Sequence, residues 1–259
     1  MPARDLDLLI DAARAAGRIA MRYTGPTPRW DKPGGAGPVT EADLAVNDLL
    51  QTTLCGARPD YGWLSEETED SAARLSRDRV FIVDPIDGTR SFADGSRTWA
   101  HAIAVAEHGV VTAGVVFLPM RGLMYTAAAG MGAFVNGSRM TPSRRDTLTA
   151  AEILATKPNM EAVHWNPGQV PDFNRSHRPS LAYRMALVAE GRFDGMLTLR
   201  PCWEWDIAAG DLILREAGAA CTDKTGAPLH FNNPHPTVNG VIAAGPVVHG
   251  LIRDALRDS

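Results

Sequence analysis

The chain has 259 residues, of which 45% are hydrophobic and 22% are charged, so it can bury a large core as one compact unit or two closely packed halves. Its formal net charge of −4 provides no general positive field, and we expect neither nucleic acid nor a membrane surface as a partner. The three cysteines lie far apart without zinc-ligand spacing, which favours a reducing, cytoplasmic location. Acidic residues interrupt the N-terminal apolar positions, unlike a signal peptide, and no apolar run reaches the roughly 18 residues of a membrane span.

The first elements expected are two helices separated by a loop. Apolar side chains at helical spacing predict an amphipathic helix over residues 5–22. The stretch DKPGGAGP at 31–38 ends that pattern with turn-forming residues and predicts a mobile loop that carries one positive charge, Lys32. Thr40 is the expected N-cap of the second helix, with Asp43 in its first turn.

Strands are expected next. The run RVFIVD at 79–84 is short, apolar and β-branched, which predicts a buried strand that ends at Asp84. Further apolar runs joined through glycine-containing turns predict an antiparallel meander from about residue 100 to about residue 140.

A polar segment, TPSRRDTLTAA at 141–151, is the expected boundary between an N-terminal half, 1–145, and a C-terminal half, 146–259. Beyond it, predicted strands and helices alternate, including a helix over 179–191 with Pro179 in its first turn. We therefore expect an α+β first half and an α/β second half.

The most specific chemistry lies in VDPIDGTRSF, residues 83–92. Asp84 ends the predicted strand, and Pro85 constrains the turn so that Asp87 can return toward the same point. Two such carboxylates repel each other unless a cation lies between them. Hard ions such as Mg²⁺ bind carboxylate, carbonyl, water and phosphate oxygens, so the Ile86 carbonyl is a further candidate ligand.

The residues that follow this turn suit a phosphate group. Gly88 permits close backbone approach, and Thr89 offers a hydroxyl beside exposed amides. The same composition is also typical of an ordinary turn. Two other acidic motifs, LSEET with Glu66 and Glu67 and EWDIAAG with Asp206, would individually be read as a solvated surface and a helix cap.

Taken together, the motifs VTEAD, LSEET, DPIDGT and WDIAAG occur in a characteristic order and approximate spacing. In this respect the chain resembles, over nearly its whole length, the lithium-sensitive, Mg²⁺-dependent phosphatase superfamily typified by inositol monophosphatase. The resemblance implies a layered αβαβα sandwich with the metal site between its halves. It also implies about two to three Mg²⁺ ions at each site, a small phosphorylated metabolite as substrate, and a possible homodimer.

The resemblance also implies roles for particular residues. Asp84 would bridge two metal ions, and a third, weaker ion would lie near Glu66. Thr89, paired with Asp43 or Glu66, would orient a water for in-line attack, and the Gly88 and Thr89 amides would hold the phosphate. The metal ligands that it implies are Glu66, Asp84, the Ile86 carbonyl, Asp87 and Asp206.

The resemblance leaves the substrate open. The position seven residues before Asp206 is a substrate-binding glutamate in typical inositol monophosphatases, and here it is Leu199, which cannot accept hydrogen bonds from inositol hydroxyls. The segment from LSEET to TRSF and the EWD motif look closer to bacterial 3'(2'),5'-bisphosphate nucleotidases, which convert 3'-phosphoadenosine 5'-phosphate to AMP. We therefore expect that reaction.

Several residues are candidates for contacts with such a substrate. For the second phosphate these are Arg90, Arg200 or Lys32; for the adenine ring, Tyr183 or Trp203; and, as a further contact, Ser180. The alternative activities are an inositol-1-monophosphatase or another sugar or histidinol phosphate phosphatase. An alternative of another class is a catalytically silent, metal-binding regulatory protein.

Overall fold

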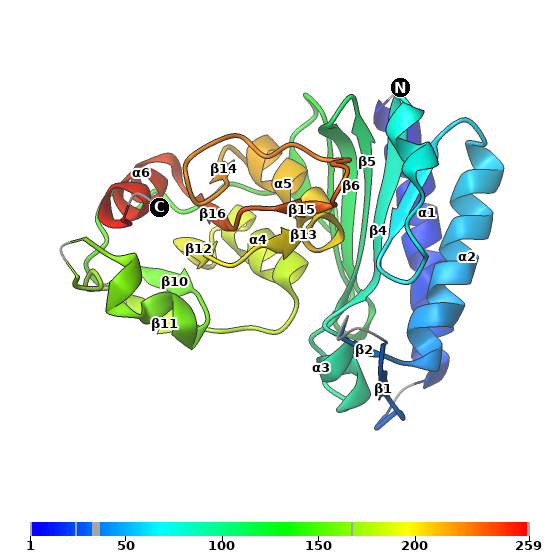
Figure 1. Ribbon diagram of the computed structural model, residues 1–259, viewed down its shortest axis with the longest axis horizontal. Helices are drawn as coiled ribbons and strands as arrows, with labels where there is room; N and C mark the ends of the chain where they lie inside the picture. The colour runs from blue at the N-terminus through cyan, green and yellow to red at the C-terminus, as the bar shows by residue number, and fades with distance from the viewer. Residues whose placement is uncertain (1, 24, 33–36, 167, 258–259) are drawn as a thin grey trace.

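The computed structural model describes residues 2–23, 25–32, 37–166 and 168–257. Helices and sheets alternate in five layers (Figure 1). None of the helices in the described ranges is both long and apolar enough to cross a membrane. The helices are α1 (Pro2–Ala20), α2 (Glu41–Ala57), α3 (Thr89–Ala93), α4 (Leu181–Ala189), α5 (Glu204–Ala217) and α6 (Pro246–Ala255).

The larger sheet has seven strands, β3 to β9, in sequence order. β3 and β4 are parallel, and each later neighbouring pair is antiparallel, which confirms the meander predicted from about 100 to 140. The strand predicted over 79–84 continues to Asp87. The strands are β3 (Gly62–Ser65), β4 (Arg79–Asp87), β5 (Ala100–Glu107), β6 (Val110–Leu118), β7 (Leu123–Ala128), β8 (Ala133–Val135) and β9 (Ser138–Arg139).

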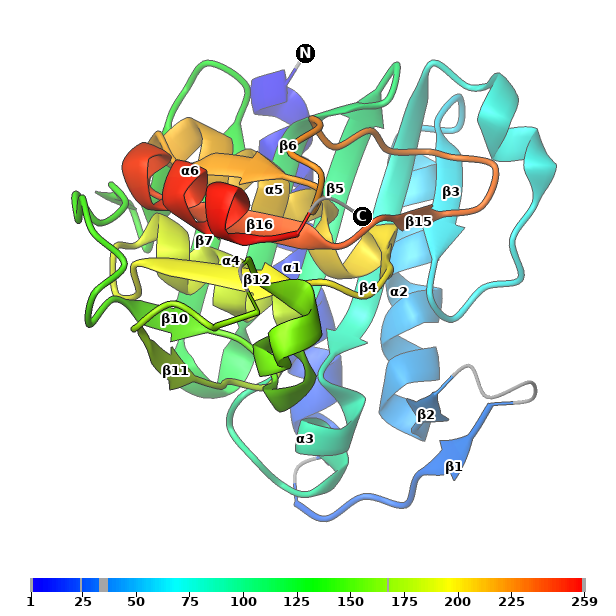
Figure 2. The same ribbon diagram turned by 60° about the vertical axis from the view of Figure 1, so that its left-hand side comes forward.

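The smaller sheet has five strands in the order β11-β10-β12-β16-β14. Figure 2 shows α6 in front of β16 in this sheet. Its strands are β10 (Glu152–Leu154), β11 (Asn174–Ser176), β12 (Gly195–Thr198), β14 (Ala220–Thr222) and β16 (Val241–Ala244). Two short antiparallel pairs lie outside both sheets: β1 (Trp30–Asp31) with β2 (Pro38–Val39), and β13 (Cys202–Trp203) with β15 (Thr237–Val238).

Three apolar clusters hold the layers together. The first packs α4 and α5 between the two sheets, with side chains such as Ile82, Met185 and Met196. The second packs α1 and α2 on the other face of the larger sheet, and the third packs α6 on the smaller sheet. The order α, β, α, β, α confirms the predicted layered sandwich, and the division at residue 145 stays a prediction.

Two local expectations are wrong. Helix α4 begins at Leu181 with Ser180 as its N-cap, so Pro179 precedes the helix instead of occupying its first turn. The stretch 31–38 is not a loop throughout, because its two ends form the β1–β2 pair. The central part of that expected mobile loop, 33–36, lies outside the described residues.

The contact between the larger sheet and α5 generates a test of the packing. A Cβ atom at Gly114 would lie 3.2 Å from both the Cα and the carbonyl oxygen of Ala209, and this backbone cannot yield as a flexible side chain would. We expect Gly114→Ala to lower the free energy of unfolding in urea by about 1–3 kcal/mol. The matched control is Gly56→Ala in α2, where nothing lies within 4 Å. It should raise that free energy by about 0.5–1 kcal/mol. A stabilising Gly114→Ala would contradict the close approach.

Candidate metal centre

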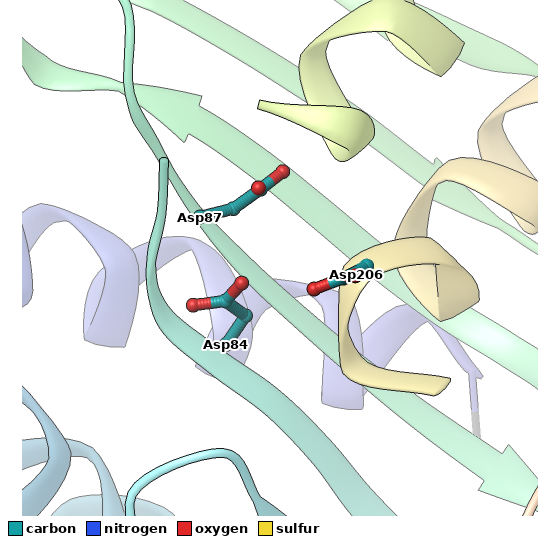
Figure 3. A group of neighbouring side chains, drawn as sticks. All are labelled: Asp84, Asp87 and Asp206. Atoms are coloured by element: carbon teal, nitrogen blue, oxygen red, sulfur yellow. The ribbon is translucent and has the colours of Figure 1, made fainter. Parts of the chain in front are cut away.

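Three carboxylates meet between the larger sheet and α5. Asp84 and Asp87 come from the end of β4, and Asp206 comes from the first turn of α5. One oxygen of each lies within 4.8 Å of an oxygen of the other two, and Figure 3 shows the side chains pointing toward one another. Asp206 follows Asp84 by 122 positions in the sequence (206 − 84), so the fold alone brings them together.

A β-bulge puts the two carboxylates of β4 on the same face. In a regular strand, residues three positions apart project from opposite faces of the sheet. Here the register with β5 shifts between Asp84 and Asp87, so the two residues between them lie opposite a single residue, His101. The core shows the resulting change of phase, because Ile86 packs in the same apolar cluster as Val83.

The electrostatics of the cluster favour a bound cation. Burial raises the pKa of Asp84 well above its usual range, and the charges of Glu66, Asp87 and Asp206 raise it further. Burial likewise raises the pKa of Asp206, again helped by Asp87. In the described part of the chain, the buried Oδ1 atom of Asp84 has no hydrogen-bond partner. Closely spaced hard oxygen donors with an unpartnered buried atom fit a divalent cation such as Mg²⁺.

The N-terminus of α4 fixes Asp87. Its Oδ2 atom accepts hydrogen bonds from the Ser180 hydroxyl and from the Ala182 amide, each at 2.7 Å. The Ser180 hydroxyl oxygen in turn accepts from the Tyr183 amide at 3.0 Å. Burial still raises the pKa of Asp87, although these hydrogen bonds oppose the shift. Ser180, predicted as a substrate contact, therefore orients an acidic side chain of the cluster in this structure.

Glu66 lies beside the cluster and forms an ion pair with Lys32. The Lys32 ammonium group donates to Glu66 and to Glu67, with 2.9 Å in each case. Burial raises the pKa of Glu66 to about 7, while the Lys32 charge opposes the shift. Of the four acidic residues expected to converge, three share the carboxylate group, and Glu66 contacts Lys32. Lys32, suggested as a phosphate ligand, is thus an internal counter-ion here.

Thr89 and Asp43 are neighbours, as one of the two expected pairings requires. The Thr89 hydroxyl lies 3.2 Å from Asp43 Oδ1 and 3.2 Å from the Ile86 carbonyl oxygen. Asp43 Oδ2 accepts from the amide and the hydroxyl of Thr40, the N-cap of α2. Burial raises the pKa of Asp43 to about 6. Gly88 precedes α3 with φ of 100°, a conformation that glycine adopts readily.

The other predicted substrate contacts have different surroundings. Arg90 and Arg200 are exposed, and the Arg200 charge lowers the pKa of Asp206, which is consistent with a position near the carboxylate cluster. The ring of Tyr183 is 2% exposed within the core, which leaves no face free to stack on a base. Trp203 is 40% exposed and stacks on Trp205, with 4.7 Å between ring centroids.

Sequence reasoning missed Arg184, which lies half-buried on α4. Its guanidinium group donates to the Arg178 carbonyl oxygen and lies 2.9 Å from His177 Nε2. Burial lowers its pKa, and the charge of Asp87 opposes this shift. Arg184 follows the N-cap Ser180 by four positions, which places it on the same side of α4 as Ser180. This spacing is the sequence feature that could have identified Arg184.

A layered αβαβα sandwich with this buried acidic cluster defines a class of metal-dependent phosphomonoester hydrolases. The chain belongs to the inositol monophosphatase family, whose model matches residues 3–259. It is 34% identical to an inositol-1-monophosphatase from Rhizobium meliloti over 85% of this chain and 86% of that protein. It is 33% identical to a histidinol-phosphatase from Mycobacterium tuberculosis over 92% and 94%. The crystal structure of the extragenic suppressor protein suhB from Bartonella henselae superposes with a TM-score of 0.82, at 30% identity over 99% of both chains.

These relatives confirm the phosphatase family that the motifs predicted. They are named an inositol-1-monophosphatase, a histidinol-phosphatase and a suhB protein, so the closer resemblance to bisphosphate nucleotidases is not confirmed. They support the alternative activities better than the expected nucleotidase reaction.

The raised pKa values predict how stability depends on pH without metal. Unfolded carboxylates titrate near pH 4, whereas Glu66 and Asp43 have pKa values of about 7 and about 6 in the folded protein. The folded protein therefore holds more protons in this window, so its free energy of unfolding should fall as the pH rises from about 4 to about 7. Urea denaturation in a chelating buffer measures this, and added Mg²⁺ should reduce the fall. A free energy that rises across the window without metal would contradict the assignment.

Proposed function

We propose that the protein is a Mg²⁺-dependent phosphomonoesterase that acts on a small phosphorylated metabolite. The observation that supports this most directly is the convergence of Asp84, Asp87 and Asp206. We propose these three residues, with Glu66 and the Ile86 carbonyl, as ligands for about two to three ions. For Glu66 to act as a ligand, its contact with Lys32 would have to rearrange.

The remaining residues supply orientation and proton handling. Bound divalent ions would lower the pKa of an attacking water and neutralise charge on the phosphate. The Thr89 hydroxyl, which can donate to Asp43, would accept a hydrogen bond from that water. This contact would direct the oxygen of the water at phosphorus. The Gly88 and Thr89 amides would hold the phosphate oxygens. Because water attacks directly, no covalent phosphoenzyme is required.

For the substrate, we propose a polyol or amino-alcohol monophosphate, such as inositol 1-phosphate or histidinol phosphate. The support comes from the curated relatives, which carry the names inositol-1-monophosphatase and histidinol-phosphatase. Leu199 stands where the family resemblance would place a glutamate. It is partly buried and packs against the apolar cluster of the smaller sheet, so a different group would have to bind a substrate hydroxyl.

A specific observation keeps 3'-phosphoadenosine 5'-phosphate as a second candidate. The charges of Arg184 and Arg200 affect each other's surroundings and those of the Asp206 carboxylate, so two guanidinium groups lie near the cluster. The partly exposed Trp203 stands close by in sequence and offers an aromatic face. A second phosphate and an adenine ring are the groups that such side chains bind.

A substrate comparison distinguishes these candidates. We expect kcat/KM with Mg²⁺ to be greater for inositol 1-phosphate or histidinol phosphate than for 3'-phosphoadenosine 5'-phosphate or fructose 1,6-bisphosphate. The opposite order, with a selective loss of nucleotide hydrolysis in Arg200→Met, would favour the nucleotidase. Mg²⁺ binding without phosphate release from any of these compounds would favour a catalytically silent regulatory protein.

The metal ligands generate a separate prediction. Asp206→Asn preserves the shape of the side chain and removes the charge that a cation requires, so kcat/KM should fall by about 100-fold or more. Asp87→Asn should do the same, although it also perturbs the N-terminus of α4. The matched control is the exposed Asp254→Asn, which should leave turnover unchanged. Wild-type rates in a folded Asp206→Asn variant would refute the proposed function.

A further inference from the structure

We propose that His101 is a positioning residue of the metal centre, whose imidazole holds the β4 bulge that puts Asp84 and Asp87 on one face of the sheet. The inference rests on the proposed function, because it takes these aspartates as metal ligands. His101 lies on β5 with its ring beside Trp99 and Phe117, on the face of the sheet that packs against α1 and α2, whereas Asp84 projects from the other face.

The position of His101 in the sheet is the first support. The bulge leaves two residues of β4, Pro85 and Ile86, opposite this one residue of β5. A bulge interrupts the regular ladder of hydrogen bonds at the point where it occurs. His101 Nδ1 is hydrogen-bonded to the Pro85 carbonyl oxygen, so a side chain stabilises the interrupted stretch.

The surroundings of the imidazole are the second support. His101 is 0% exposed and lies between aromatic rings, with its centroid 5.4 Å from that of Trp99 and 6.3 Å from that of Phe117. Burial lowers its pKa to about 4, which makes the ring neutral at physiological pH. A carbonyl oxygen can only accept, so the ring proton lies on Nδ1.

The other ring nitrogen, Nε2, makes burial of the histidine energetically unfavourable. In the described part of the chain, the buried Nε2 atom of His101 has no hydrogen-bond partner. Desolvating an acceptor without a new partner is unfavourable, and an apolar residue of similar size would avoid it. The bond to Pro85 is therefore the contribution that distinguishes histidine from leucine or phenylalanine at this site.

A second side chain contacts the other residue of the bulge, Ile86. The Ile86 carbonyl oxygen lies 3.2 Å from the Thr89 hydroxyl. His101 is hydrogen-bonded to the Pro85 carbonyl oxygen, and the Thr89 hydroxyl, whose one proton is shared between the Ile86 carbonyl and Asp43, lies beside the second carbonyl oxygen. The carbonyl groups of both residues between the aspartates therefore have a neighbouring side-chain donor. Removing the His101 donor would free the first of them and let the separation of Asp84 from Asp87 vary. Partners that orient metal ligands in this indirect way commonly affect metal affinity by about 10- to 100-fold.

The test compares Mg²⁺ affinity with stability in matched variants of the full chain. His101→Leu removes the donor, whereas His101→Asn keeps an N–H group at the place of Nδ1. By calorimetric titration of metal-free protein, we expect the Mg²⁺ dissociation constant to rise about 10- to 100-fold in His101→Leu and to recover largely in His101→Asn. Phe117→Leu controls for packing beside the ring and should alter unfolding without altering the dissociation constant.

Two further measurements make the outcome decisive. Nitrogen NMR of the wild-type imidazole should show the proton on Nδ1, and a proton on Nε2 would overturn the inference even if His101→Leu fails to fold. An unchanged dissociation constant in a folded His101→Leu variant would also overturn it. Asp206→Asn serves as the reference: if it loses Mg²⁺ affinity and His101→Leu does not, only the role of His101 fails. If Asp206→Asn also binds normally, the metal centre itself is wrong.

Discussion

The mutual repulsion of three carboxylates, of which Asp84 and Asp87 are buried and Asp206 is partly buried, is the interaction that the surrounding structure must accommodate. Burial disfavours ionisation of Asp84, Asp87 and Asp206, and the charges of neighbouring carboxylates add to this effect at Asp84 and Asp206. Such an arrangement is unfavourable for folding unless protons or cations compensate it. Three separate elements nevertheless hold the carboxylates in place: the bulge of β4, the N-terminus of α4 and the first turn of α5.

Two basic side chains, Lys32 and Arg184, lie near the acidic residues of the site. Lys32 pairs with Glu66 and Glu67, and the charge of Asp87 acts on Arg184. Amide groups of α4 add partial positive charge at Asp87. These groups lessen the repulsion without entering the three-carboxylate group, which leaves its oxygens directed at one another.

Local pattern was sufficient for much of the fold and for the acidic turn. The meander, the N-cap at Thr40 and the strand before Asp84 depend on neighbours in sequence, and the structure has all of them. Asp206 was identified by the order of the motifs, since nothing in its own segment indicates a ligand. The contacts of Lys32 with Glu67 and of His101 with Pro85 were not predicted, because they depend on long-range pairing and on a bulge that the sequence does not reveal.

The apolar cluster that surrounds α4 and α5 has a consequence for how the protein can move. It includes side chains from both sheets, such as Ile82 of the larger and Met196 of the smaller. Two bodies joined by a hinge would each keep a separate core, but here any rotation of one sheet against the other would expose this common interior to water. This shared interior therefore favours the two sheets moving together as one body.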